Sequence, residues 1–142
     1  MDLPAKFLAL LLLTAATLVA APTKPAEPAH VALGEEITLA DWIVPGKTVV
    51  VDFYSDYCPP CRPYTEPLKV LHTQRDDIVV VKVDINRIGV KGIDWKSPVA
   101  QQFALRSIPH FQVYGPDGKL QSEGKDARAT VHALLEAVGA KL

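Results

Sequence analysis

Two cysteines carry the most specific chemical signal in the sequence. Cys58 and Cys61 are the only cysteines of the 142-residue chain, and two prolines, Pro59 and Pro60, separate them. Cysteines at this spacing, after a strand and before a helix, are typical of a pair that cycles between dithiol and disulfide. We therefore expect Cys58 to be the nucleophile and Cys61 to be the thiol that resolves a mixed disulfide.

The setting of the pair explains why its first thiol would react. The β-branched and aromatic run over residues 49–54 predicts a buried strand that ends shortly before Cys58. Proline suits the first turn of a helix, because the N–H that it lacks would be unpaired there in any case. Cys58 would then lie at a helix N-terminus, where free N–H groups and the helix dipole favour a thiolate.

Three other interpretations of the cysteine pair explain the sequence less well. A structural zinc ion needs four ligands, and no further cysteine or paired histidine follows at zinc-finger spacing. A purely structural disulfide would restrain the unfolded chain little, because the loop that it closes is so short. Two unrelated buried thiols would leave both the spacing and the strand-to-helix setting unexplained.

The remaining pattern predicts the elements that must hold the pair in place. The order is β-α-β-α-β-α-β-β-α, an α/β sandwich around a mixed sheet. The expected strands are residues 31–33, 47–54, 78–85, 110–114 and 119–123, and the expected helices are residues 34–43, 62–74, 98–105 and a last one that carries residues 131–138. We expect Pro67 to kink the second helix, Ser97 to cap the third and Asp126 to cap the last.

The N-terminal residues are not expected to belong to the folded domain. Residues 7–21 form a Leu- and Ala-rich apolar run that suits a signal peptide and is short for a membrane span. We predict a signal peptide over residues 1–20, or an uncleaved anchor in its place, and a proline-rich linker over residues 21–30 that holds the domain at a distance. One small domain would occupy residues 31–142, and export would place its cysteines where disulfides persist.

The charge balance narrows the classes of partner. Acidic and basic residues nearly cancel, and the net charge is −1. No basic stripe predicts nucleic-acid binding, and no acidic tail predicts a basic partner. We expect a monomer that binds no nucleic acid and holds no metal.

Taken together, these features resemble the thioredoxin superfamily over about residues 37–139. The resemblance rests on the Val-Asp-Phe run at residues 51–53, the Cys-Pro-Pro-Cys motif at residues 58–61, Lys82, and Ile108 followed by Pro109. It implies the thioredoxin fold, a central mixed β-sheet flanked by helices on both faces. With the predicted signal peptide, the chain looks similar to exported, membrane-facing thioredoxins of bacteria, including those that serve cytochrome c maturation.

The resemblance also implies a role for two charged residues. Asp52 would be a buried carboxylate beneath Cys61 that accepts a proton when Cys61 attacks, and Lys82 would lie beside it and tune it. Burial would raise the pKa of the Asp52 carboxyl towards neutrality, where general-base catalysis is efficient. The alternative is that Asp52 and Lys82 form a purely structural pair.

The resemblance places substrate-contacting residues around the cysteines. Pro109 would be a cis proline across from Cys58, and the backbone of Ile108 would pair with the substrate; an ordinary trans proline at a strand start is the alternative. Arg62 carries a positive charge where it would favour a thiolate. The expected contact residues are Tyr57, Pro59, Pro60, Ile108 and Pro109.

Two further features depart from the family pattern or stand apart from it. The segment 86–96 is longer than in minimal thioredoxins, and Ile93 and Trp95 within it would form either a partner-docking patch or a loop folded over its own Trp. His110 follows Pro109 and would face the sulfurs, the solvent or the core. His30, His72 and His132 are interpreted as surface residues.

The predicted function is thiol–disulfide exchange on exported proteins. The redox-active Cys58–Cys61 pair would be its only redox group, with protein thiols and disulfides and a membrane-borne electron donor as partners. The dipeptide lacks the histidine found in strong periplasmic oxidants, which favours a reductase over an oxidase. The alternative is a non-catalytic thioredoxin scaffold that docks a partner or binds copper through Cys58, Cys61 and His110.

Overall fold

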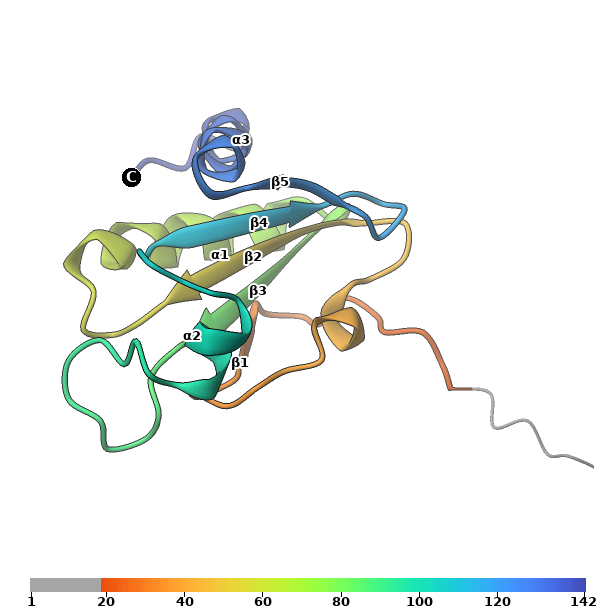
Figure 1. Cartoon of the computed structure of the whole chain (residues 1–142). Helices are drawn as coiled ribbons and strands as arrows, with labels where there is room; N and C mark the ends of the chain where they lie inside the picture. The colour runs from red at the N-terminus through yellow and green to blue at the C-terminus, as the bar shows by residue number, and fades with distance from the viewer. Residues whose placement is uncertain (1–18) are drawn as a thin grey trace, which may run out of the picture.

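The computed structural model describes residues 19–142, which form a five-stranded mixed sheet in the order β1-β3-β2-β4-β5 (Figure 1). The strands are β1 (Ala29–Val31), β2 (Thr48–Tyr54), β3 (Ile78–Asp84), β4 (His110–Tyr114) and β5 (Leu120–Glu123). The helices are the 3₁₀ segments η1 (Leu39–Trp42) and η2 (Pro59–Tyr64), and α1 (Thr65–Gln74), α2 (Pro98–Gln102) and α3 (Gly124–Ala137). The predicted signal peptide falls almost wholly on residues 1–18, outside the described residues. Across residues 19–142, none of the helices combines the length and the apolar character that a membrane crossing requires.

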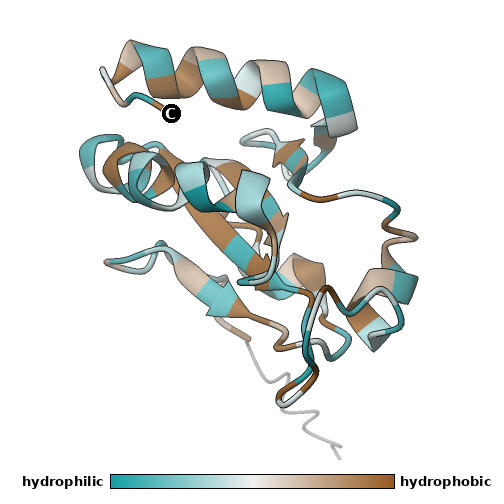
Figure 2. Cartoon of the chain, turned by 90° about the vertical axis from the view of Figure 1, so that its left-hand side faces the viewer, coloured by the Kyte–Doolittle hydropathy of each residue, from teal (hydrophilic) through white to brown (hydrophobic). Residues whose placement is uncertain are grey.

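Strand β2 is the centre of the sheet. It runs parallel to β3 and antiparallel to β4, and its middle residues are buried on both faces. Helices α1 and α3 cover one face of the sheet, and α2 with η1 covers the other (Figure 1). Figure 2 shows central strands that are mostly brown (hydrophobic), whereas the helices around them carry both brown and teal residues. This confirms the predicted mixed sheet with helices on both faces, because a central strand with two covered faces must be apolar throughout.

Alternation along β2 divides its side chains between two cores. Val49, Val51 and Phe53 pack on the α2 side, whereas Val50 packs with α1 and α3. Asp52 has the parity of Val50, so its side chain projects to the face that α1 covers. A charged group therefore lies in the middle of an otherwise apolar strand, directly behind the cysteine turn.

The first predicted helix is wrong for most of its length. Residues 34–43 form only the short η1, because the backbone turns left-handed at Ala32 (φ 79°), Leu33 (φ 48°) and Gly34 (φ 83°). A side chain at Gly34 would have its Cβ 2.5 Å from Arg87 Cγ, so this turn fits only glycine. The edge strand correspondingly lies at Ala29–Val31 rather than at residues 31–33.

The helix after the cysteines is broken at a different point from the one predicted. Residues 59–64 form the tighter 3₁₀ helix η2, which contains Pro63, and α1 starts at Thr65. Pro67 is thus the third residue of α1, where a missing N–H leaves no hydrogen bond of that helix unmade. The change of helix type at Thr65 takes the place of the expected kink at Pro67.

The two remaining capping predictions have opposite outcomes. The Ser97 hydroxyl accepts a hydrogen bond from the Ala100 N–H (3.2 Å), which confirms it as the N-cap of α2. That helix stops at Gln102, short of the predicted residue 105, and Ala104 beyond it has a φ of 48°. Asp126 is wrong as a cap, because α3 already begins at Gly124 and Asp126 lies in its first turn.

The proline-rich segment contacts the domain instead of standing away from it. The Lys24 ammonium donates to the carbonyl oxygens of His72 (2.7 Å) and Arg75 (2.8 Å) at the end of α1. The His72 ring accepts from the Val80 N–H at Nδ1 (3.0 Å), so its Nε2 carries the proton that it donates to the Pro25 carbonyl (2.9 Å). His72 is therefore a buried connector between α1, β3 and residues 24–25, not a surface residue.

Candidate active site

The two cysteines form a disulfide at the C-terminal end of β2. Their Cα atoms are 5.3 Å apart, Cys58 is the N-cap of η2, and the Cys61 N–H donates to the Cys58 carbonyl (3.1 Å). This confirms the predicted position of Cys58 at a helix start, although the helix there is a short 3₁₀ segment. Both residues are nearly covered, with 1% of Cys58 and 3% of Cys61 exposed. A substrate sulfur must therefore approach Cys58 along the rim of residues that surrounds it.

One side of the rim is the Ile108–Pro109 peptide. That bond is cis, as the resemblance implied, and the Ile108 carbonyl oxygen lies 3.7 Å from Cys58 Sγ. Pro109 is buried, and its carbonyl accepts a hydrogen bond from Arg128 Nη2 on α3 (2.8 Å). Arg128 was not expected at the site, since it follows Pro109 by 19 positions and no local pattern marks it.

The other side of the rim holds the exposed residues. Tyr57 is 47% exposed, and Pro59 and Pro60 are exposed as well. The Tyr57 N–H donates to the Ser55 hydroxyl (3.1 Å), which in turn donates to the Asn86 side-chain oxygen (2.6 Å). The structure thus gathers all five predicted contact residues around Cys58; their roles in substrate binding stay predictions.

Behind the disulfide lies the predicted buried pair. Lys82 Nζ is 2.9 Å from Asp52 Oδ2, and the two residues pair across β2 and β3 with at most 3% of either side chain exposed. Asp52 Oδ1 is also buried and has no hydrogen-bond partner. Burial raises the pKa of the Asp52 carboxyl, and Lys82 opposes the rise by charge and by its hydrogen bond. A buried carboxylate with one unpaired oxygen and a raised pKa is a stronger proton acceptor than an ordinary exposed aspartate.

The Lys82 end of the pair leads towards solvent. Lys82 lines a cavity of about 260 Å³ together with His30, Glu66 and Lys69. Its ammonium also lies 4.3 Å from the centre of the Tyr54 ring, and the Tyr54 hydroxyl is 3.1 Å from His30 Nδ1. Burial raises the pKa of the Tyr54 hydroxyl, so this hydroxyl stays protonated at neutral pH. The cavity brings Lys82 together with polar side chains from other elements, an arrangement that the sequence did not reveal.

Two other candidate residues are hydrogen-bonded to partners other than the sulfurs. The Arg62 guanidinium donates to the Asp56 carbonyl (3.3 Å), and the His110 ring hydrogen-bonds to Glu123 (3.0 Å). His110 also lies edge-on to Phe53, with ring centroids 5.7 Å apart. No hydrogen bond joins His110 to either sulfur, so the three residues of the predicted copper alternative do not form one ligand set. Within residues 19–142, no group of three or more His, Cys, Asp or Glu side chains is arranged to hold a metal ion.

Known proteins with similar sequences are thioredoxins, in agreement with the arrangement of the cysteine pair, the buried Asp52–Lys82 pair and the cis proline. A profile of the family described as Thioredoxin matches residues 38–138. A thioredoxin-like protein of Fusarium culmorum is 30% identical over 100 residues, which span 64% of this chain and 75% of that protein. Thioredoxin-3 of Dictyostelium discoideum is 29% identical over 108 residues, which span 76% of this chain and 93% of that protein.

Solved structures share the fold. A mutant thioredoxin from Halobacterium salinarum NRC-1 is 25% identical, with a TM-score of 0.54 over 84% of this chain and 97% of that one. A chain in a complex of ferredoxin:thioredoxin reductase and thioredoxin f2 is 23% identical, with a TM-score of 0.57 over 83% of this chain and 100% of that one. The fold is the thioredoxin fold, and the matched region contains the cysteine motif, the buried pair and the cis proline. The chain belongs to the thioredoxin family and is a thiol–disulfide oxidoreductase that works through the Cys58–Cys61 pair.

Proposed function

We propose that this oxidoreductase works as a disulfide reductase on exported proteins and receives its electrons from a membrane-borne donor. The apolar run over residues 7–21 supports export, since it has the length of a signal-peptide core. Outside the cytosol, protein disulfides persist and are available as substrates. A reductase there needs a source of electrons that reaches across the membrane, because the cytosolic thiol pool is out of reach.

The surroundings of Cys58 Sγ are the observation that supports reduction, rather than oxidation, of substrates. The hydrogen-bond contact found for Cys58 Sγ among the described residues is with the Ile108 carbonyl, 3.7 Å away, and a carbonyl favours a thiol over a thiolate. The nearby Arg62 guanidinium is bound to the Asp56 carbonyl instead. Strong oxidants have a stabilised reduced form, in which the thiolate is held by charge or hydrogen bonds. The start of the short η2 favours the Cys58 thiolate, but among residues 19–142 no hydrogen bond from a charged side chain adds to it, so we expect the pair to give up its electrons more readily than a strong oxidant does and to reduce its substrates.

The exchange proceeds in two balanced steps. The Cys58 thiolate attacks one sulfur of the substrate disulfide, so that a mixed disulfide forms and the first substrate sulfur leaves as a thiolate that takes up a proton. Cys61 then loses its proton to the Asp52 carboxylate and attacks Cys58 Sγ, which releases the second substrate sulfur as a thiolate that also takes up a proton. The substrate has gained two electrons, and the enzyme is left with the Cys58–Cys61 disulfide.

The test is a redox titration of residues 21–142 combined with trapping. A midpoint close to that of reducing thioredoxins, far below that of the strong periplasmic oxidants, is expected, and a midpoint near the oxidants would reverse the direction. Cys61→Ser should accumulate mixed disulfides on Cys58 with exported proteins in cells, and Cys58→Ser is the matched control that should trap nothing. Finding the trapped partners only in the cytosol would overturn the proposed location.

A further inference from the structure

The segment 86–96 is a braced loop next to the disulfide. The Asn86 amide donates to the carbonyls of Val90 (3.2 Å) and Gly92 (2.6 Å), and its side-chain oxygen accepts from the Asp94 N–H (3.2 Å). The same oxygen accepts from the Ser55 hydroxyl (2.6 Å), so the base of the loop is attached to the cysteine turn. Asn86 is buried, which makes these bonds costly to break.

An ion pair closes the loop from the other side. Arg87 holds Asp94 through two charge-assisted bonds, 2.7 Å from Nε and 3.0 Å from Nη2. The Asp94 side chain is 4% exposed, and its hydrogen bond to Arg87 lowers the pKa of this carboxyl. The loop thus has a fixed shape through internal bonds, although it contains no helix or strand.

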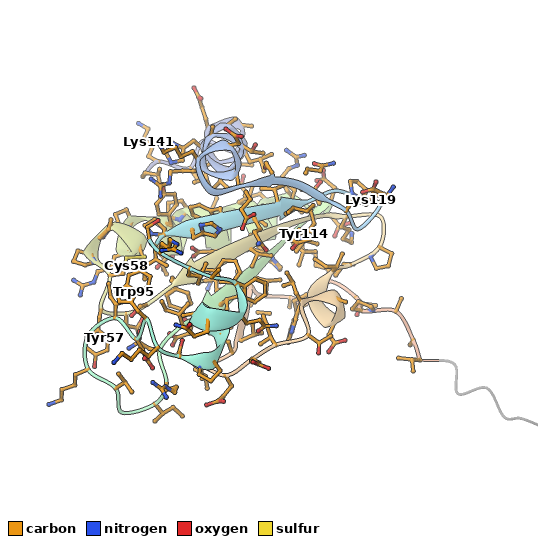
Figure 3. The ribbon with its side chains drawn as sticks, viewed as in Figure 1. Tyr57, Cys58, Trp95, Tyr114, Lys119 and Lys141 are labelled. Carbon is orange, nitrogen blue, oxygen red and sulfur yellow. A yellow bond between two sulfur atoms is a disulfide. The ribbon has the colours of Figure 1, made fainter. Side chains whose placement is uncertain are left out.

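The braced loop presents apolar side chains to solvent. Ile88 is 86% exposed and Trp95 is 37% exposed, and Tyr57 at the active-site rim is 47% exposed. The Ser55 hydroxyl bonds to both Asn86 and the Tyr57 N–H, which places the loop base next to the active-site rim. Figure 3 shows Trp95, Tyr57 and Cys58 at the same end of the molecule. The loop is held in one shape by buried hydrogen bonds and an ion pair, and it exposes apolar side chains to solvent. These two properties together are typical of a surface that contacts another protein.

The charge of the loop indicates what it contacts. Arg87 and Asp94 neutralise each other, and the other two charged residues, Lys91 and Lys96, are both exposed. Neither lysine forms an ion pair with another described residue. The loop is therefore positive on a chain whose net charge is −1, so it is complementary to an acidic segment.

We infer that the 86–96 loop docks protein substrates that carry acidic side chains and a large apolar side chain beside the disulfide to be reduced. The apolar side chain packs on Ile88 and Trp95, and the carboxylates face Lys91 and Lys96. The inference rests on the proposed exchange function and names the substrate class of the same site. The loop selects substrates by binding, and it takes no part in the exchange of electrons.

The test compares three disulfides with the oxidoreductase comprising residues 21–142. One is a peptide with Glu and Leu next to its disulfide, one is the same peptide with Lys and Ser, and the third is hydroxyethyl disulfide, which is small and neutral. We expect kcat/KM to favour the acidic peptide at low ionic strength and to lose that preference at high ionic strength. Lys91→Glu should lower kcat/KM for the acidic peptide about fivefold, the scale of one exposed ion pair, and should leave hydroxyethyl disulfide unchanged.

Two further variants test the apolar contact and control for a general effect of charge. Ile88→Ser, at a side chain that is 86% exposed, should raise KM for the acidic peptide without changing kcat. Lys119→Glu is the matched control, because it makes the same charge change in the β4–β5 turn at the opposite end of the molecule from Cys58 (Figure 3). Equal effects of Lys91→Glu and Lys119→Glu would overturn the inference, and so would an effect of Lys91→Glu on hydroxyethyl disulfide.

A binding measurement separates the inference from the exchange function. The acidic peptide with both cysteines replaced by serine has no disulfide, so its binding is independent of exchange. Binding that shifts the Trp95 indole resonance and weakens in Lys91→Glu supports docking even if turnover fails. Turnover of hydroxyethyl disulfide without such binding would leave the exchange function intact and refute the docking surface.

Discussion

Replacement of Asp52 by Asn should remove a pH-dependent loss of stability from the oxidised protein. In the folded state the Asp52 carboxyl is fully buried, Oδ1 has no hydrogen-bond partner, and burial outweighs Lys82, so its pKa is raised. In the unfolded chain this carboxyl has a pKa of about 4. Between the two pKa values the folded state holds a proton that the unfolded state has lost. The contribution is therefore fully present below pH of about 4 and is lost as pH rises through the folded pKa.

The size of the effect follows from linkage. Over that window the stability contributed by Asp52 falls by about 1.4 kcal/mol per pH unit, and above the folded pKa the curve is flat. Urea unfolding of wild type and Asp52→Asn should be measured from pH 4 to 7, with the disulfide intact so that no thiol titrates. The difference between the two proteins isolates Asp52 from the other titrating groups.

Asp77 serves as the control, because its pKa is lowered by folding whereas the pKa of Asp52 is raised. The hydrogen bond from Arg75 lowers the pKa of Asp77 to about 2, so the contribution of Asp77 is present at neutral pH and is lost as pH falls. Asp77→Asn should give a difference of opposite sign, and a small one because the pair is exposed. A wild-type-minus-Asp52→Asn difference that does not change with pH would refute the reasoning, since burial and Lys82 would then cancel.

Three further predictions follow from the contacts described above. Lys82→Met removes the charge that opposes the rise in the pKa of Asp52, so in a single-turnover pH profile the resolving step should reach its maximum rate at higher pH; an unchanged profile would contradict general-base work by Asp52. Arg128→Met leaves the Pro109 carbonyl without its donor and should lower stability by about 1–3 kcal/mol in urea unfolding, with a larger fall in kcat/KM for a peptide than for a small disulfide. Burial lowers the pKa of His72, so stability relative to His72→Gln should fall in urea unfolding as pH drops below about 6.5, and a difference that stays constant over this range would contradict the assignment.

The sequence predicted the parts of the fold that local patterns encode. The apolar run of β2, the β-hairpin after Pro109 and the Ser97 cap each depend on neighbouring residues, and all three are present. The prediction of a helix over residues 34–43 was wrong, because the left-handed turn at residues 32–34 depends on close contact with Arg87, which lies far along the chain.

The same distinction applies to the site. Cys58, Cys61 and the residues around them were found from spacing and resemblance. Arg128 on the Pro109 carbonyl and Asn86 on the Ser55 hydroxyl were missed, because a single polar side chain that bonds to a distant partner leaves no periodic trace. Such bonds become visible only when the sheet has brought their partners together.

The hydrogen bonds of Lys24 and Pro25 to α1 and its end fix the point at which the N-terminal segment joins the domain. The chain upstream of this attachment leaves the domain at the end opposite to Cys58 (Figures 1 and 3). A tether joined to this segment would therefore be attached at the end of the domain opposite to Cys58, and the disulfide would lie at the end away from the point of attachment. The contact with the domain begins upstream of Lys24, because Pro22 and Thr23 line a cavity together with Trp42.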